Sequence, residues 1–79
     1  MSRDEILSKI KAIIVEHFEV EENEITEATN IKDDLNADSI NIMEFVLELE
    51  DVFDAEISDE DAEKIETVGA AVDYLFANQ

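Results

Sequence analysis

Few residues of this chain could carry out covalent chemistry, and their types restrict what that chemistry could be. The 79 residues include one histidine, His17, and no cysteine. A cysteine–histidine pair is therefore excluded, and a serine–histidine–aspartate triad would have to use His17. The single glycine, Gly69, cannot form a glycine-rich loop that cradles phosphates. What remains is the tripeptide Asp38-Ser39-Ile40, whose serine is either a plain helix-start residue or a functional hydroxyl.

Carboxylates are abundant, with 23 aspartates and glutamates in the chain. Their number alone does not exclude a carboxylate pair for glycoside hydrolysis, but a chain of this size offers little cleft to desolvate such a pair. The runs at residues 33–34 and 59–61 lack the glycine and the terminal glutamate of the EF-hand spacing. We therefore predict no dedicated metal site, and only weak surface binding of divalent cations.

The elements that must position these residues begin with a helix from about Arg3 to Phe18, where apolar residues recur at helical spacing. Ser2 followed by Glu5 is a capping-box pattern, and His17 would lie in the last turn, where the helix dipole favours a cation. Residues 19–37 lack a regular pattern and predict a long loop, and loops of this length are often functional. Four spaced apolar residues could hold this loop against the core: Val20, Ile25, Ile31 and Leu35.

A second helix is predicted from Ser39 to about Phe53, with Asp38 as its N-cap. At 100° per residue its apolar residues fall into two groups. The broad group is expected in the core: Ile42, Phe45, Val46, Leu49, Val52 and Phe53. The narrow group is either buried as well or exposed as a docking strip: Ile40, Met43 and Leu47. A polar arc lies opposite the broad group: Asn41, Glu44, Glu48 and Asp51.

Two further helices complete the expected fold. A short third helix is predicted to begin at Ser58 and to end near Ile65, and Thr67 is a good N-cap for a last helix from Val68 to about Ala77. The apolar face of this last helix comprises Val68, Ala71, Val72, Leu75 and Phe76. No alternation typical of strands is present. We therefore predict an all-α fold: a single-domain four-helix bundle over residues 1–79, with three longer helices, a short third helix and an aliphatic core.

The net charge of −18 restricts the partners of the protein. Residues 33–66 hold fourteen acidic residues and one basic residue, Lys64. Such a surface repels nucleic acid and anionic lipid, and it favours basic protein surfaces. No apolar run approaches the roughly 18 residues of a membrane span, and the N-terminus lacks the pattern of a signal peptide. We expect a monomeric cytoplasmic protein without membrane insertion.

The run of residues 34–40, together with the glutamate-rich segment that follows it, resembles acyl carrier proteins. In that family an acidic residue precedes Leu-Gly-Ala-Asp-Ser-Leu, and the helix that follows ends near Glu-Phe. Residues 56–65 resemble the short third helix of the family, and residues 67–75 resemble its last helix, so the similarity covers nearly the whole chain. The chain departs from the family pattern at Asn36 (usually glycine), Ile40 (leucine), Asn41 (aspartate) and Ser58 (proline). Asparagine tolerates positive φ, so the turn at Asn36 can persist.

The resemblance implies that Ser39 is the attachment point of 4′-phosphopantetheine, which a phosphopantetheinyl transferase moves from coenzyme A. Acyl groups would then be carried as thioesters on the cofactor thiol, which fits the absence of cysteine, and the chain itself would not be an enzyme. Asp38 would offer a carboxylate to the transferase. The family also implies a space for the acyl chain between the helices, where Ala62 and Ala71 leave room.

The second helix would be the surface that partner enzymes recognise. Its acidic residues would attract basic docking patches on the transferase and on fatty-acid synthesis and acyltransferase enzymes, and its narrow apolar group would add contact area. The acidic residues are Glu44, Glu48 and Asp51, and the apolar residues are Ile40, Met43 and Leu47. Electrostatic steering raises the association rate without demanding tight binding, which suits a carrier.

Two alternatives to a carrier of fatty-acid synthesis remain at this point. The same arm could carry polyketide, peptidyl or D-alanyl units, in which case an adenylating enzyme would load it. Alternatively, the chain could be an acidic helical adaptor or cation-binding module without a cofactor. The third-helix string of residues 56–65 favours fatty-acid synthesis.

Overall fold

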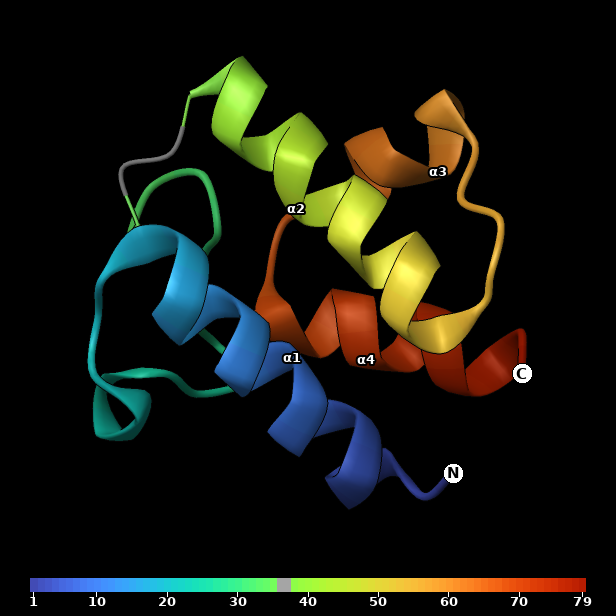
Figure 1. Cartoon of the computed structure of the whole chain (residues 1–79), viewed down its shortest axis with the longest axis horizontal. Coiled ribbons are helices and arrows are strands. Elements are labelled where there is room, and N and C mark those ends of the chain that lie inside the picture. The colour runs from blue at the N-terminus through green and yellow to red at the C-terminus, as the bar shows by residue number, and fades with distance from the viewer. Residues whose placement is uncertain (36–37) are drawn as a thin grey trace.

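The computed structural model describes residues 1–35 and 38–79; the expected turn at Asn36 lies outside this part of the chain. The helices are α1 (Arg3–Phe18), α2 (Ser39–Phe53), α3 (Asp59–Lys64) and α4 (Val68–Ala77), and the loop between α1 and α2 contains a 3₁₀ turn, η1 (Glu22–Glu24) (Figure 1). The all-α fold with a short third helix is confirmed. Outside helices and loops, the described residues form one isolated antiparallel bridge, between Asn30 and Thr67.

The helix boundaries agree with the sequence because the signals that set them are local. Each helix is preceded by a side-chain oxygen that accepts a hydrogen bond from a backbone N–H three residues further on. The acceptor and donor pairs are Ser2 and Glu5, Asp38 and Asn41, Ser58 and Asp61, and Thr67 and Ala70. At the other end, Glu19 and Asp54 adopt left-handed backbone conformations with φ of 54° and 50°, which end α1 and α2.

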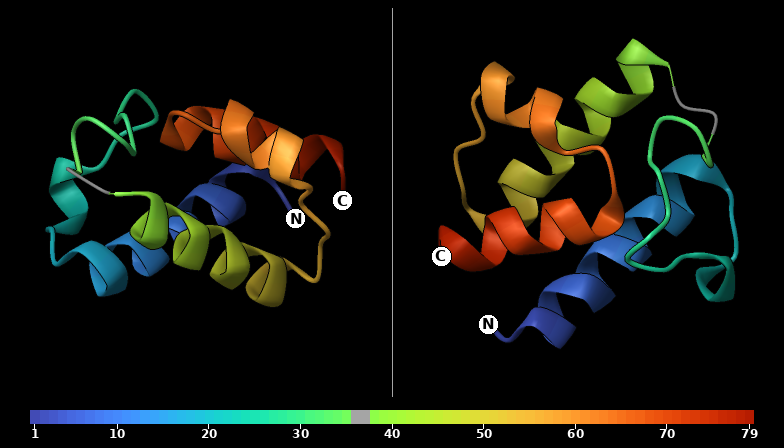
Figure 2. Two further views of the ribbon diagram at one scale, coloured as in Figure 1. Left: turned by 90° about the horizontal axis from the view of Figure 1, so that it is seen from above. Right: turned by 180° about the vertical axis from the view of Figure 1, so that it is seen from behind.

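The helix α1 packs against both α4 and α2. Figure 2 shows α2 on one side of the molecule and α3 with α4 on the other. The two termini lie at the same end, where the Met1 amino group donates to Gln79 Oε1 at 2.6 Å and Gln79 Nε2 donates to the Met1 carbonyl oxygen at 2.9 Å. The N-terminal end of α2 lies away from this end (Figure 1).

The core is aliphatic except for one buried aromatic side chain, Phe45. Buried residues come from α1, α2 and α4 and from the segments that flank α3. Phe18, at the end of α1, packs edge-on against Phe45 with ring centroids 6.2 Å apart. The buried residues are Ile6, Ile10, Ile13, Ile14, Ile25, Ile31, Phe45, Val46, Leu49, Ile57, Ile65, Val68, Ala71, Val72 and Leu75.

Two residues expected in the core are exposed. Val52 of α2 is 38% exposed, and Phe76 of α4 is 43% exposed. At 100° per residue, both lie at the edge of the apolar arc of their helix, and both lie near its C-terminal end. The expectation that they are buried is wrong because residues nearer the centre of each arc, such as Leu49 and Leu75, already fill the contact with the other helices.

The long loop is held against the core, as its spaced apolar residues predicted. Ile25 and Ile31 are buried, and Val20 and Leu35 are half-buried. The backbone of the loop also meets the start of α4. The N–H of Val68 donates to the Thr29 carbonyl oxygen at 3.0 Å, and the N–H of Gly69 donates to the Glu27 carbonyl oxygen at 2.8 Å. Loop carbonyls therefore satisfy two N–H groups that the first turn of a helix leaves free.

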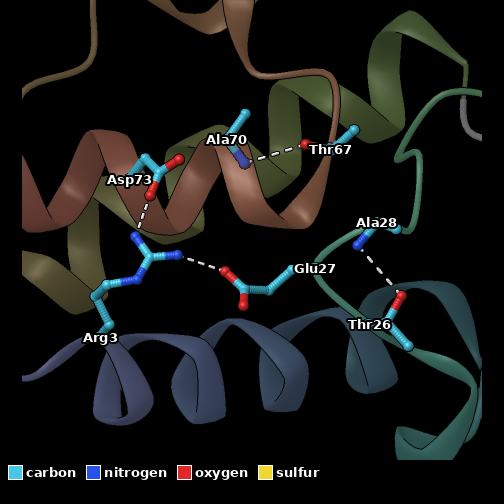
Figure 3. Close-up of polar contacts among 7 residues, drawn as sticks. All are labelled: Arg3, Thr26, Glu27, Ala28, Thr67, Ala70 and Asp73. Atoms are coloured by element: carbon cyan, nitrogen blue, oxygen red, sulfur yellow. Dashed lines mark hydrogen bonds and ion pairs between the residues drawn. The ribbon is translucent and has the colours of Figure 1, made fainter.

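Arg3 adds an ionic connection between three elements. Its guanidinium lies between Glu27 of the loop and Asp73 of α4, and it donates a hydrogen bond to each carboxylate (Figure 3). The hydrogen bond to Asp73 raises the pKa of Arg3 above its ordinary value, so the group stays charged. The pairs are exposed to solvent, so we assign them a role in positioning the loop rather than a large share of the stability.

A larger side chain at Gly69 is expected to lower the stability of the fold. A Cβ atom at this position would lie 2.9 Å from the Glu27 carbonyl oxygen, which the Gly69 N–H itself binds, and 3.2 Å from the Glu27 Cβ. Overpacking of this kind costs about 1–3 kcal/mol, whereas alanine gains about 1 kcal/mol in helix propensity. Urea unfolding of Gly69→Ala should therefore show a loss of about 1 kcal/mol. A gain in stability would contradict the close approach of the loop.

Candidate functional site

Ser39 is the first residue of α2, and its side chain is exposed. The preceding Asp38 caps the helix, with its Oδ1 accepting from the Asn41 N–H at 2.9 Å. The Ser39 hydroxyl forms no hydrogen bond with any other described residue, whereas the hydroxyls of Ser2 and Ser58 are occupied as N-caps. Because Asp38 takes the capping role, the Ser39 hydroxyl is left available for a covalent partner.

The position of Ser39 favours a negative charge on a group attached there. The N-terminus of a helix carries a partial positive charge and is a good place for a phosphate. The first turn of α2 contains no acidic residue. Asp38 opposes this field as a like charge, but its carboxylate oxygen is already engaged by the Asn41 N–H. An anionic phosphodiester on Ser39 is therefore compatible with the surroundings that this end of α2 provides.

An open groove of about 440 Å³ runs beside Ser39. Its walls come from α2 and α3, with one residue from the loop. The lining combines apolar side chains with one basic and two acidic ones. The lining residues are Lys32, Ser39, Ile42, Met43, Val46, Asp59, Ala62 and Glu63. Of the two alanines expected to leave room for a chain, Ala62 lines this groove, while Ala71 is fully buried in the core. A linear group attached at Ser39 therefore has an apolar surface within reach.

Apart from Ala62, sequence reasoning missed the residues of α3 that line the groove. Asp59 and Glu63 appear in the sequence only as members of an acidic run, and nothing local indicates which element they face. Lys32 was likewise overlooked, although it is a rare basic residue next to the acidic middle of the chain. Its charge was the one signal that could have drawn attention to it.

The narrow apolar group of α2 is exposed, which resolves the alternative left by the sequence. Ile40, Met43 and Leu47 are 67%, 64% and 58% exposed, and we call them the apolar strip. Glu44, Glu48 and Asp51, which we call the acidic row, lie beside it on the helix; Glu48 is half-buried and the other two are exposed. Large apolar side chains edged by carboxylates are typical of a docking surface for another protein.

Three further features considered from the sequence are His17, a metal site and a membrane span. His17 is exposed in the last turn of α1, as predicted. In residues 1–35 and 38–79, no three histidine, cysteine, aspartate or glutamate side chains converge as a possible metal site. No helix in the same ranges has the length and apolar character that crossing a membrane requires.

Four helices with an exposed serine at the start of α2, beside an apolar groove, suit a carrier domain for a covalently attached arm. Residues 8–75 match the family described as the phosphopantetheine attachment site. The chain belongs to this family and, within it, to the acyl carrier proteins. It therefore bears a 4′-phosphopantetheine prosthetic group.

Similar proteins support this assignment over the full length of the chain. The acyl carrier protein of Lactobacillus acidophilus is 56% identical, and that of Lactobacillus johnsonii is 48% identical; each match covers 100% of this chain and 99% of the relative. The solved structure of the acyl carrier protein from Enterococcus faecalis, described for its high thermal stability, is 66% identical. It superimposes with a TM-score of 0.87 and covers 100% of both chains.

A hydrogen bond connects α4 to α3 on the side of α3 away from the groove lining. The Tyr74 hydroxyl donates to Asp61 Oδ2 at 2.9 Å and lies 3.4 Å from the Glu56 carbonyl oxygen. The bond to Asp61, with a smaller contribution from burial, raises the pKa of Tyr74 above its ordinary value of 10.0. Neither Tyr74 nor Asp61 lines the groove.

Alkaline titration is expected to detect this bond directly. The chain has one tyrosine and no tryptophan, so phenolate absorbance reports Tyr74 alone. Because the folded-state pKa is raised, the bond stabilises the fold fully below pH 10.0, and this contribution is lost as the pH rises through the raised pKa. Asp61→Ala should move the midpoint back toward 10.0, whereas Glu60→Ala on the same helix should leave it unchanged. Equal midpoints for Asp61→Ala and the wild type would contradict the assignment.

Proposed function

We propose that Ser39 is the residue that bears the phosphopantetheine arm, and that the protein carries growing fatty acyl chains on it between the enzymes of fatty-acid synthesis. The observation that carries this proposal is the exposed Ser39 hydroxyl, which Asp38 frees from capping and which lies on the rim of the groove. The named relatives are themselves acyl carrier proteins, which supports a carrier of acyl groups.

The residues around Ser39 fit the proposed attachment. The phosphodiester would lie at the positive end of α2, and the arm could extend along the apolar wall formed by Ile42, Val46 and Ala62. When bound, the arm supplies a terminal thiol that holds acyl groups as thioesters, which the cysteine-free chain cannot supply itself. An unassisted serine is a weak nucleophile, so the base and magnesium for attachment belong to the transferase.

The surface of α2 provides the docking function in this proposal. The acidic row would attract basic residues of the transferase and of client enzymes, and the apolar strip would bury a small area in each complex. Asp38, exposed next to the attachment point, would present its carboxylate to the transferase. A carrier must leave each enzyme quickly, and contacts of this kind speed association without slowing release. Catalysis would therefore come from the partners and not from this chain.

Intact mass spectrometry tests the proposal directly. The unmodified protein is incubated with coenzyme A, magnesium and a broad-specificity phosphopantetheinyl transferase, and fragment masses then locate any added group. We expect a gain of one phosphopantetheine on Ser39, followed by loading with malonyl or acyl groups by fatty-acid synthesis enzymes. A folded chain that gains no mass while a control carrier is modified would refute the attachment. Loading only by an adenylating enzyme would refute the assignment to fatty-acid synthesis.

A further inference from the structure

The helix α3 is the wall of the groove that contributes no fully buried residue to the core. None of its six residues is buried, although Asp59, Ala62 and Glu63 line the groove. The core holds α3 mainly through its flanks, where Ile57 and Ile65 are 7% and 4% exposed, and within the helix through half-buried Ala62, which packs against the core. The opposite wall, α2, is fixed by buried Phe45, Val46 and Leu49. If the groove widens, α3 is therefore the wall that moves.

One side-chain hydrogen bond in the described part of the chain joins α3 to another helix, and it is the bond from Tyr74 to Asp61. The Asp61 residue is itself well placed for this role, because its backbone N–H donates to the Ser58 hydroxyl at the start of α3. The bond from Tyr74 to the Asp61 side chain therefore helps to fix the position of the whole short helix. Since neither partner lines the groove, the bond acts on a bound group only through the position of α3.

We propose that the Tyr74–Asp61 hydrogen bond is a latch that holds α3 beside the groove and thereby limits the length of acyl chain that the groove shelters. This inference rests on the proposed function for its ligand, an aliphatic thioester attached at Ser39. With the latch closed, the groove of about 440 Å³ shelters a short chain. A longer chain requires α3 to move outward, and this displacement breaks the bond. Tyr74 is a positioning residue in this scheme, and it does not contact the cargo.

The unmodified protein gives the first test, by amide hydrogen exchange of Tyr74→Phe, which removes only the hydroxyl. The Ala62 N–H, which donates to the Ser58 carbonyl, and the Ile65 N–H, which donates to the Ala62 carbonyl, report on α3. Both should exchange about threefold to tenfold faster, while amides of α1 keep their rates. Glu60→Gln, which changes an exposed α3 residue away from the latch, should leave both rates unchanged. Unchanged α3 exchange in Tyr74→Phe would overturn the proposal.

The cargo gives the second test, by the rate at which hydroxylamine cleaves hexanoyl and palmitoyl thioesters loaded through the transferase. Releasing the latch should shelter the long chain better, so Tyr74→Phe should slow palmitoyl cleavage about threefold and leave hexanoyl cleavage unchanged. Simple loosening of the fold would instead speed both reactions, and that result would overturn the proposal. Intact mass before cleavage shows whether the protein was loaded. Absence of loading refutes the proposed function, whereas the exchange measurement tests the Tyr74–Asp61 bond without any cargo.

Discussion

Substitution of Ser39 by alanine is expected to abolish phosphopantetheine attachment completely and to leave the fold unchanged. The side chain is exposed, and it contributes no hydrogen bond to the described structure. Alanine is also a better helix former than serine, and Asp38 continues to cap α2. The free energy of unfolding should therefore stay within about 0.5 kcal/mol of the wild type. Intact mass after incubation with coenzyme A and the transferase measures attachment, and urea unfolding measures the fold.

Ser58→Ala is the matched control, because Ser58 also lies at the start of a helix. Its hydroxyl caps α3 by accepting from the Asp61 N–H at 3.1 Å. Loss of an N-cap costs about 1 kcal/mol, so this variant should be less stable than Ser39→Ala and yet accept the arm normally. The two serines thus separate capping from attachment. A Ser39→Ala protein that still gains the mass of one phosphopantetheine would show that another hydroxyl carries the arm.

The parts of this molecule that sequence predicted are those set by neighbouring residues. An N-cap acts over three residues, so Ser2, Asp38, Ser58 and Thr67 marked the four helix starts correctly. The apolar strip of α2 could be separated from the core residues because helical spacing fixes the direction of each side chain. The proposal of Ser39 as the attachment point came from the resemblance of the residues around it to acyl carrier proteins, and the structure adds that its hydroxyl is not the cap of α2.

The parts that sequence did not predict depend on contacts between distant segments. The groove forms because α3 lies beside the start of α2, and no local pattern reports that placement. Similarly, the Tyr74–Asp61 bond joins residues thirteen positions apart on different helices. Gly69 reads as a weak point of α4 until the Glu27 carbonyl is seen 2.8 Å from its N–H. The wrong prediction that Val52 is buried has the same cause, because burial at the edge of an apolar arc depends on which residues the facing elements cover.

A charge reversal in the acidic row tests whether the negative charge of α2 guides the transferase to the protein. Glu44→Lys is expected to lower kcat/KM of the transferase about tenfold at low ionic strength, because Glu44 is exposed beside the apolar strip and would face basic residues of the enzyme. Lysine and glutamate have similar helix propensities, so the helical circular dichroism should not change. Added salt should narrow the difference from the wild type, since exposed charges are screened beyond about 10 Å at 0.1 M.

Glu5→Lys makes the same change in net charge, from −18 to −16, at a different place. Glu5 is exposed in the first turn of α1, and the N-terminal end of α1 lies across the molecule from the start of α2 (Figure 1). If the transferase recognises the surface of α2, Glu5→Lys should retain nearly the full kcat/KM, although it loses a favourable interaction with the helix dipole. If both variants slow the reaction equally, the enzyme responds to overall charge and the acidic row has no special role. Steering by a localised face requires the two variants to differ, because the field of a charge in salt reaches little further than its own side of so small a molecule.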